Sequence, residues 1–235
     1  MPSSSIEFLL NNELITINDV NTNTTVLEYL RNFKNLKGTK EGCASGDCGA
    51  CTAVIAEVKN NTLKYKSINT CITLLYSLHS KQLLTVEYIE SKYLHPVQQS
   101  MVDNDGAQCG FCTPGFVMSM YAMHKNKIRP TESNINRYLS GNLCRCTGYR
   151  PIKEALKNLK KYKNLESDTS KVFRKLKKIK LNDVVVGNNE TKFFIHHNLK
   201  SFKKDFTKSK NPSLLVGSSP SRFCADRSSR LSAAC

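Results

Sequence analysis

Apolar and polar residues alternate at the start of the chain, as they do in a β-hairpin. In "IEFLLNNELITIN" (6–18), apolar residues recur at every second position on either side of two asparagines, which tolerate the positive φ of a tight turn. Further on, the strand-like segments "TAVIAEV" (52–58) and "TLKYKSI" (62–68) flank a second pair, Asn60 and Asn61. Two hairpins are therefore predicted.

A short amphipathic helix is predicted between the two hairpins. Thr25 and Glu28 have the spacing of a capping box, in which each residue satisfies a free backbone N–H of the first turn. Apolar residues that share one helical face accompany them: Val26, Leu27, Leu30 and Phe33. Residues 1–88 therefore predict a small mixed sheet crossed by one helix.

From Tyr93 onward the apolar period becomes helical. Four segments show it: 97–103, 115–125, 132–139 and 152–162. Prolines stand where three helices can begin: Pro96, Pro114 and Pro151. Thr113 is a candidate N-cap, and the methionines of 116–123 indicate core packing rather than a cofactor site. A four-helix domain over residues 89–163 is predicted.

Composition favours a soluble, cytoplasmic protein. The first residues lack the basic start and apolar stretch of a secretory signal, and no run approaches the roughly 20 apolar residues of a membrane span. Thiols stay reduced in the cytoplasm, so the ten cysteines point to metal binding or catalysis before disulfides.

The net charge of +16 is unevenly distributed. Residues 1–151 hold 15 basic against 12 acidic residues, whereas residues 152–235 hold 20 against 7. Only the second part offers a basic footprint for a polyanion, and its clusters are equally typical of a solvated helix or linker. Nucleic-acid binding is therefore the less favoured interpretation.

Cysteines of the first set have the spacing C-x4-C-x2-C, with a fourth well downstream: Cys43, Cys48, Cys51 and Cys71. This is the plant-type spacing for a [2Fe–2S] cluster. Glycines at 42, 46 and 49 let the backbone curl so that its N–H groups face an anionic cluster. Zinc is the alternative, although it usually binds paired short C-x2–4-C knuckles.

The second set has the spacing C-x2-C and then C-x-C: Cys109, Cys112, Cys144 and Cys146. Each pair lies in a turn before a predicted helix, so the two turns can meet at one end of the helical domain. Helix N-termini there would place partial positive charge beside an anionic cluster. A zinc ribbon is the alternative, but C-x-C is an uncommon zinc pair.

Several of these segments closely resemble the iron–sulfur region of the xanthine dehydrogenase and molybdenum hydroxylase family: "TKEGCASGDCGACT", "INTCI", "HPVQQSMVDNDGAQCGFCTPGFVMS" and "GNLCRCTGYRPI". The likeness covers residues 5–160 and is strongest to separate small subunits of the bacterial enzymes. It implies an α+β chain, with a β-grasp ferredoxin-like domain at 1–88 and a four-helix domain at 89–163. Each domain would hold one [2Fe–2S] cluster.

The resemblance also implies a function. In this family substrate is oxidised at a molybdopterin centre on a partner subunit, and electrons pass through two clusters to FAD and NAD. By position, the second cysteine set would hold the cluster nearer molybdenum, and the first set the one nearer flavin. Gln108 and Cys146 match positions close to the pterin; a satisfied buried amide is the alternative for Gln108. The expectation is a cytoplasmic oxidoreductase subunit that transfers electrons without substrate chemistry of its own.

The tail departs from the family pattern. A basic linker is predicted over 164–189, and 190–235 resembles only the start of an FAD-binding domain, with "SLLVGSS" (213–219) as a strand entering a phosphate loop. After Ser218 the composition changes, which indicates a truncation or frame shift, or else a true C-terminus with a disordered tail. Whether FAD binds stays open.

Other candidate ligands are weak. Cys224 and Cys235 have no cysteine at ligand spacing, and His196 and His197 are interpreted as surface or core residues. Two functional alternatives remain beside the xanthine dehydrogenase reading. The first is the iron–sulfur subunit of a molybdenum hydroxylase that oxidises an aldehyde, carbon monoxide or an N-heterocycle, and the second is a zinc-stabilised nucleic-acid-binding module.

Overall fold

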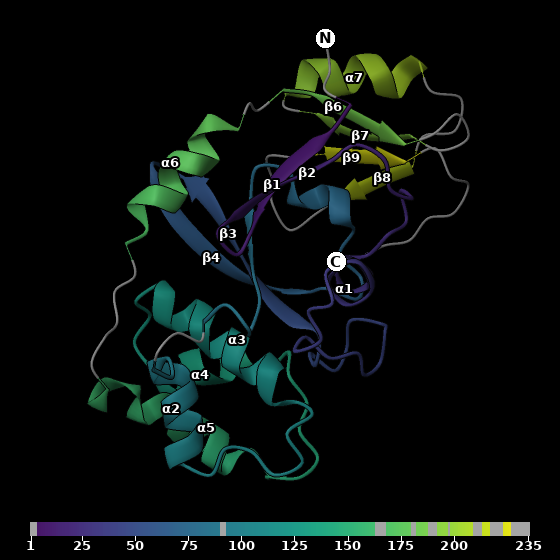
Figure 1. Cartoon of the computed structure of the whole chain (residues 1–235). Helices are drawn as coiled ribbons and strands as arrows, with labels where there is room; N and C mark the ends of the chain where they lie inside the picture. Colours follow the sequence, from purple (N-terminus) through teal and green to yellow (C-terminus); the bar gives the residue numbers. More distant parts are fainter. Residues whose placement is uncertain are drawn as a thin grey trace.

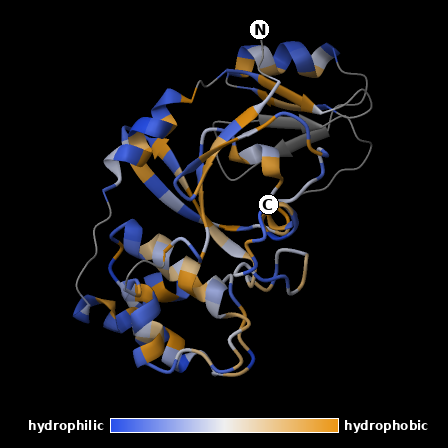
Figure 2. Ribbon diagram, in the orientation of Figure 1, coloured by the Kyte–Doolittle hydropathy of each residue, from blue (hydrophilic) through white to orange (hydrophobic). Residues whose placement is uncertain are grey.

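Two β-sheets and a layer of helices form the chain (Figure 1). The computed structural model describes residues 4–89, 93–162, 168–179, 182–187, 192–196, 198–208, 213–216 and 223–226. In Figure 1 the helical domain lies at the lower end, the second sheet at the upper end, and the first sheet between them. In Figure 2 hydrophobic colour is strong on β1 and β3, whereas β4, α6 and α7 show much hydrophilic colour.

The first sheet is mixed and has the order β2-β1-β5-β3-β4. Its strands are β1 (Ile6–Leu10), β2 (Glu13–Ile17), β3 (Thr52–Lys59), β4 (Thr62–Asn69) and β5 (Gln82–Leu84). Strand β5 lies between the hairpins, parallel to β1 and antiparallel to β3. Asn11, Asn60 and Asn61 have φ of 57°, 48° and 57°. Both predicted hairpins are confirmed, with asparagine in the left-handed region at each turn.

The predicted crossing helix consists of α1 (Val26–Glu28) and a π-helical turn, η1 (Tyr29–Phe33). Thr25 Oγ1 accepts the Glu28 N–H at 3.1 Å, which confirms the N-cap. The prediction that Phe33 shares the buried face is wrong, since it is 59% exposed. The Lys34 N–H bonds to the Tyr29 carbonyl, five residues back. This wider turn rotates Phe33 off the apolar face.

Four helices form the second domain, as predicted. They are α2 (Pro96–Asp103), α3 (Thr113–Lys125), α4 (Glu132–Leu139) and α5 (Arg150–Asn158), which continues as the short helix η3 (Leu159–Lys161). All three prolines lie in first turns, and Met118, Met120 and Met123 are buried in the core. Thr113 is not the N-cap: Cys112 takes that position, because the cysteine turn extends up to the helix.

His95 is the buried cap of α2. Its Nδ1 accepts the Val97 N–H at 3.3 Å, and its ring packs edge-on against Tyr121 and His124. Burial lowers the pKa of His95 to about 4, and the charges of His124 and Lys125 act in the same direction. A neutral imidazole therefore caps this helix.

The chain is expected to lose stability as the pH falls from neutral. Because the pKa of His95 lies below its ordinary value of 6.5, its contribution is complete above that value and is lost as the pH falls toward the folded-state pKa. The expected loss between about pH 7 and about pH 5 is about 2 kcal/mol. Denaturant unfolding at both pH values would measure it. His95→Asn keeps a capping acceptor but does not titrate, so an equal loss in this variant would contradict the assignment.

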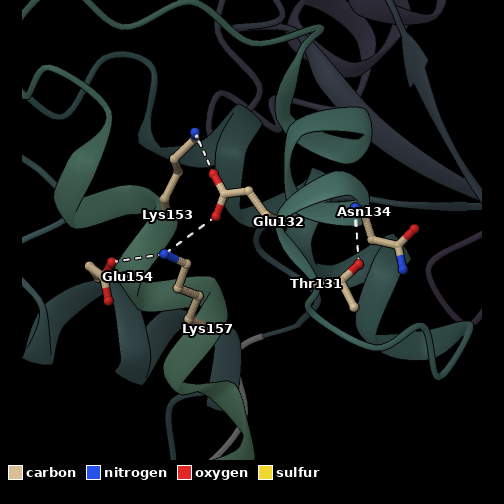
Figure 3. A network of polar contacts seen from close by, with 6 residues as sticks. All are labelled: Thr131, Glu132, Asn134, Lys153, Glu154 and Lys157. Atoms are coloured by element: carbon tan, nitrogen blue, oxygen red, sulfur yellow. Dashed lines mark hydrogen bonds and ion pairs between the residues drawn. The ribbon is translucent and has the colours of Figure 1, made fainter.

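Charged side chains join α4 to α5 at the surface (Figure 3). Lys153 Nζ donates to Glu132 Oε1 at 3.1 Å, and Lys157 Nζ lies 3.4 Å from Glu132 Oε2 and 3.2 Å from Glu154 Oε1. The hydrogen bond from Lys153 is the main reason that the pKa of Glu132 is lowered. Pairs this exposed to water contribute little to stability, so the apolar core holds the two helices together.

Helix α6 (Ser170–Lys178) lies within the segment predicted to be a basic linker. Its apolar side packs on the first domain, where Val172, Leu176 and Ile179 form a cluster with Leu9. Its lysines bind the hairpin turns: Lys175 Nζ donates to the Asn12 carbonyl at 2.8 Å and Lys177 Nζ to Asn61 Oδ1 at 3.0 Å. The described part of this segment is therefore folded, because its apolar residues recur at helical spacing among the lysines.

The second sheet is antiparallel, with the order β6-β7-β9-β8, and α7 (Leu199–Lys208) packs against it. Its strands are β6 (Val184–Gly187), β7 (Lys192–His196), β8 (Ser213–Val216) and β9 (Phe223–Asp226). Phe193 stacks on Tyr76 of the short helix η2 (Leu75–Leu78), with ring centroids 5.6 Å apart. The predicted strand at 213–216 is confirmed, and β9 lies in the tail whose composition is anomalous. The second sheet thus shares the core of the first domain.

Several residues singled out in the tail can now be placed. His196 is buried, and its Nδ1 lies 3.9 Å from Asp205 Oδ2, so it is a core histidine. Cys224 belongs to β9. His197 and Cys235 lie outside the described residues. No helix in the described part of the chain has the length and apolar character needed to cross a membrane.

Candidate metal centres

Cys43 is held by the backbone of the loop that precedes β3. Its Sγ accepts N–H hydrogen bonds from Ser45, Asp47 and Cys48 at 3.4, 3.3 and 3.3 Å. Hydrogen bonds from Ser45 and then Cys48 lower the pKa of Cys43 to about 6. The thiolate, the form that binds a metal, therefore predominates at neutral pH.

Cys51 and Cys71 are brought together by the β3–β4 hairpin. Thr52 pairs with Asn69 at the hairpin's open end, so the residues just beyond these two strand ends come together. The two sulfurs lie 3.3 Å apart, well beyond the roughly 2.05 Å of a disulfide. Burial, and then the neighbouring Cys51, raise the pKa of Cys71 to about 12. Two thiolates this close would repel one another unless a cation lay between them.

The second set lies where the turns before α3 and α5 meet, as predicted. Cys109 and Cys146 have sulfurs 3.4 Å apart. Burial raises the pKa of Cys112 to about 12, and the neighbouring Cys144 thiol acts in the same direction. All eight cysteines of the two sets are free thiols.

Thr147 and Tyr149 support the second set, and sequence reasoning did not single them out. Thr147 Oγ1 lies 3.1 Å from Cys144 Sγ, and the Tyr149 hydroxyl accepts the Cys144 N–H at 3.0 Å. Tyr149 has φ of 67°, an uncommon conformation for a residue of this size. The position of Tyr149 directly after Gly148 was the one indication in the sequence of a tight turn here. Both residues fix the orientation of a predicted ligand.

The sulfur pairs of the two sets suit [2Fe–2S] clusters. Among the described residues, no group of three Cys, His, Asp or Glu side chains is placed to hold a metal ion. The sulfurs instead come in close pairs, Cys51–Cys71 and Cys109–Cys146. A [2Fe–2S] cluster takes two protein ligands on each iron, so such pairs suit it.

Gln108 does not have the buried environment that was one alternative for it. Its side chain is exposed, as are the thiols of Cys109 and Cys146 beside it. The turn between the cysteines also exposes Phe111. Polar, apolar and thiol groups thus share one surface at the second set, where a partner could reach them.

Both domains match known iron–sulfur families. Residues 8–76 match the 2Fe-2S iron-sulfur cluster binding domain, and residues 85–157 match the [2Fe-2S] binding domain. These matches confirm the two predicted iron–sulfur domains and the mixed α+β class. Neither match extends to the second sheet, where the start of an FAD domain was predicted.

About two thirds of the chain is also similar to a part of larger enzymes. Xanthine dehydrogenase of Emericella nidulans is 47% identical over 154 residues, which cover 64% of this chain and 11% of that protein. Aldehyde oxidase 1 of Oryctolagus cuniculus is 46% identical over 160 residues, which cover 66% and 12%. In the crystal structure of quinoline 2-oxidoreductase from Pseudomonas putida 86, one chain aligns with a TM-score of 0.56 and 29% identity, covering 66% of this chain and 90% of that one. This chain therefore spans only 11–12% of these two curated relatives.

Proposed function

We propose that the chain relays electrons from a molybdopterin-binding partner toward a flavin, through the two [2Fe-2S] domains matched at residues 8–76 and 85–157. The observation that carries the proposal is two complete four-cysteine sets, one in each domain, on the two sides of a single interface. A relay needs two such sites in fixed relation to each other.

Each site is assigned its residues. The first cluster is held by Cys43, Cys48, Cys51 and Cys71, and the second by Cys109, Cys112, Cys144 and Cys146. When bound, each cluster supplies one-electron chemistry at a potential tuned by hydrogen bonds to its sulfurs. The chain contributes the N–H groups around Cys43 and the Thr147 hydroxyl beside Cys144, which favour thiolates.

The surface of the second set is the proposed face for the molybdopterin partner. Gln108 and Cys146 are exposed there, in line with a position near the pterin. Related enzymes carry this region in two ways. It is nearly a whole chain in quinoline 2-oxidoreductase and a small part of xanthine dehydrogenase, so the partner is either a separate subunit or a further part of a longer chain.

A xanthine dehydrogenase type of enzyme is the proposed context, in cytoplasm, with FAD and NAD as downstream acceptors. The second sheet, following the helical domain, occupies the place in the chain where a flavin domain would start. An aldehyde oxidase type is the second candidate, because the identities to the two curated relatives are nearly equal, 47% and 46%. The zinc module is not favoured, because both cysteine sets lie within residues that match [2Fe-2S] domains.

Reductive titration would test the relay. Under anaerobic conditions the reconstituted chain should take up about two electrons per molecule, one for each cluster, and release them to an oxidant. The same chain stripped of iron by a chelator is the control and should take up none. Uptake of one electron or fewer by a chain with full iron content would contradict a two-site relay.

A further inference from the structure

Helix α3 is pinned to the first domain at both ends. At its C-terminal end, Asn126 Oδ1 accepts the Tyr65 N–H at 3.1 Å and Asn126 Nδ2 donates to the Tyr65 carbonyl at 2.7 Å. At its N-terminal end, the contact is made by Gly115 and by Asn142, which comes from the turn before α5. Only the second contact adjoins the cysteine sets.

The Asn142 side-chain amide makes three hydrogen bonds within this interface. Its side chain is buried, at 3% exposure. Nδ2 donates to the Gly49 carbonyl at 3.0 Å and to Thr52 Oγ1 at 3.2 Å, both in the first domain. Oδ1 accepts the Ser119 hydroxyl of α3 at 2.6 Å. The Asn142 side chain therefore connects the loop of the first set to α3 and to the turn before α5.

The backbones approach so closely here that side chains are excluded. A Cβ added at Gly115 would lie 2.2 Å from the Gly49 carbonyl oxygen. A Cβ added at Gly49 would lie 2.2 Å from the Gly141 carbonyl oxygen, and Gly49 also has φ of +69°. The close approach depends on glycine at both positions.

One backbone hydrogen bond joins the segments that carry the two cysteine sets. The Leu143 N–H donates to the Cys48 carbonyl at 2.9 Å. Cys48 belongs to the first set, and Leu143 is bonded directly to Cys144 of the second. A continuous route thus runs from Cys48 through its carbonyl and the Leu143 amide to Cys144.

We propose that Asn142 is the positioning residue that holds the Leu143 N–H on the Cys48 carbonyl, and so fixes the two cysteine sets relative to each other. The inference rests on the proposed function. With a cluster bound at each set, one electron would pass from the second set to the first, with no proton moved and no bond formed or broken.

Asn142→Ala and Asn126→Ala are a matched pair for the test, since each removes an amide that joins the two domains. Both variants are compared as iron-loaded full chains. Hydrogen–deuterium exchange of the peptide containing Leu143 measures the protection given by its hydrogen bond to the Cys48 carbonyl. Electron paramagnetic resonance of the fully reduced chain measures the magnetic coupling between the two clusters. Asn142→Ala should speed exchange at Leu143 about tenfold and reduce the splitting of the resonance lines. Asn126→Ala should leave both readouts as in the wild type.

Wild-type exchange and coupling in Asn142→Ala would overturn the proposal, as would equal changes in both variants. If Asn142→Ala does not fold, Ser119→Ala takes its place, since it removes the hydroxyl that orients the Asn142 amide. An intermediate change at Leu143 then supports the proposal, and wild-type behaviour overturns it.

A second pair tests the close approach itself. Gly115→Ala places a methyl group against the Gly49 carbonyl, whereas a methyl group at Gly141 meets nothing within 4 Å. Gly115→Ala should weaken the coupling although alanine favours helix, and Gly141→Ala should not. The two failures are distinguishable. If the proposed function is wrong, the wild-type chain binds no iron. If only this inference is wrong, both clusters bind and their coupling is unchanged in Asn142→Ala and Gly115→Ala.

Discussion

Replacing Cys51 with alanine is expected to halve the iron content of the chain, from about four to about two atoms, with an equal fall in acid-labile sulfide. Cys51 is buried just before β3, with its sulfur 3.3 Å from that of Cys71, so its loss removes half of one close ligand pair. The second set lies in another domain and keeps its cluster. Iron and sulfide analysis of the purified variant would measure the effect.

Cys224→Ser is the control for this experiment. Cys224 lies on β9, outside both cysteine sets, so its replacement should leave about four iron atoms in place. Full iron content in Cys51→Ala would show that this thiol is no ligand. A loss of iron in Cys224→Ser matching that in Cys51→Ala would show that the assay reports misfolding rather than ligation.

Tyr76→Ala is expected to destabilise the chain by about 4 kcal/mol. Tyr76 is fully buried in η2, its hydroxyl accepts the Val20 N–H at 3.0 Å and donates to the Val20 carbonyl, and its ring stacks on Phe193. The substitution leaves a cavity between the first domain and the second sheet. Urea unfolding followed by circular dichroism would measure the loss.

Tyr76→Phe separates packing from hydrogen bonding at the same site. It keeps the ring stacked on Phe193 and removes only the hydroxyl, so the expected loss is about 1–2 kcal/mol. A loss below about 1 kcal/mol in Tyr76→Ala would contradict the assignment of the second sheet to the core of the first domain.

Local chemistry made much of the fold predictable. Asparagine pairs marked both hairpin turns because this residue tolerates positive φ, and prolines marked three helix starts because they need no N–H bond there. Phe33 was misplaced because nothing in a one-dimensional pattern signals a π-turn. Helix α6 was taken for a linker because its many lysines obscure three apolar residues at helical spacing.

The cysteines of the candidate site were predictable, but their supports were not. Spacing along the chain brings out ligands that lie in one loop or in paired turns. Asn142 and Tyr149 act through contacts with residues of another loop or domain, which no spacing rule reveals. Gly115 belongs to the same class, since a backbone that approaches from elsewhere in the fold requires it, and Gly49 was singled out for its loop but not for this close approach.

Iron and acid-labile sulfide analysis of the wild-type chain, with its visible spectrum, tests the central claim most directly. Two [2Fe–2S] clusters on eight cysteines predict a red-brown protein with about four iron and four sulfide per chain. A colourless protein that contains stoichiometric zinc and no acid-labile sulfide would contradict the account.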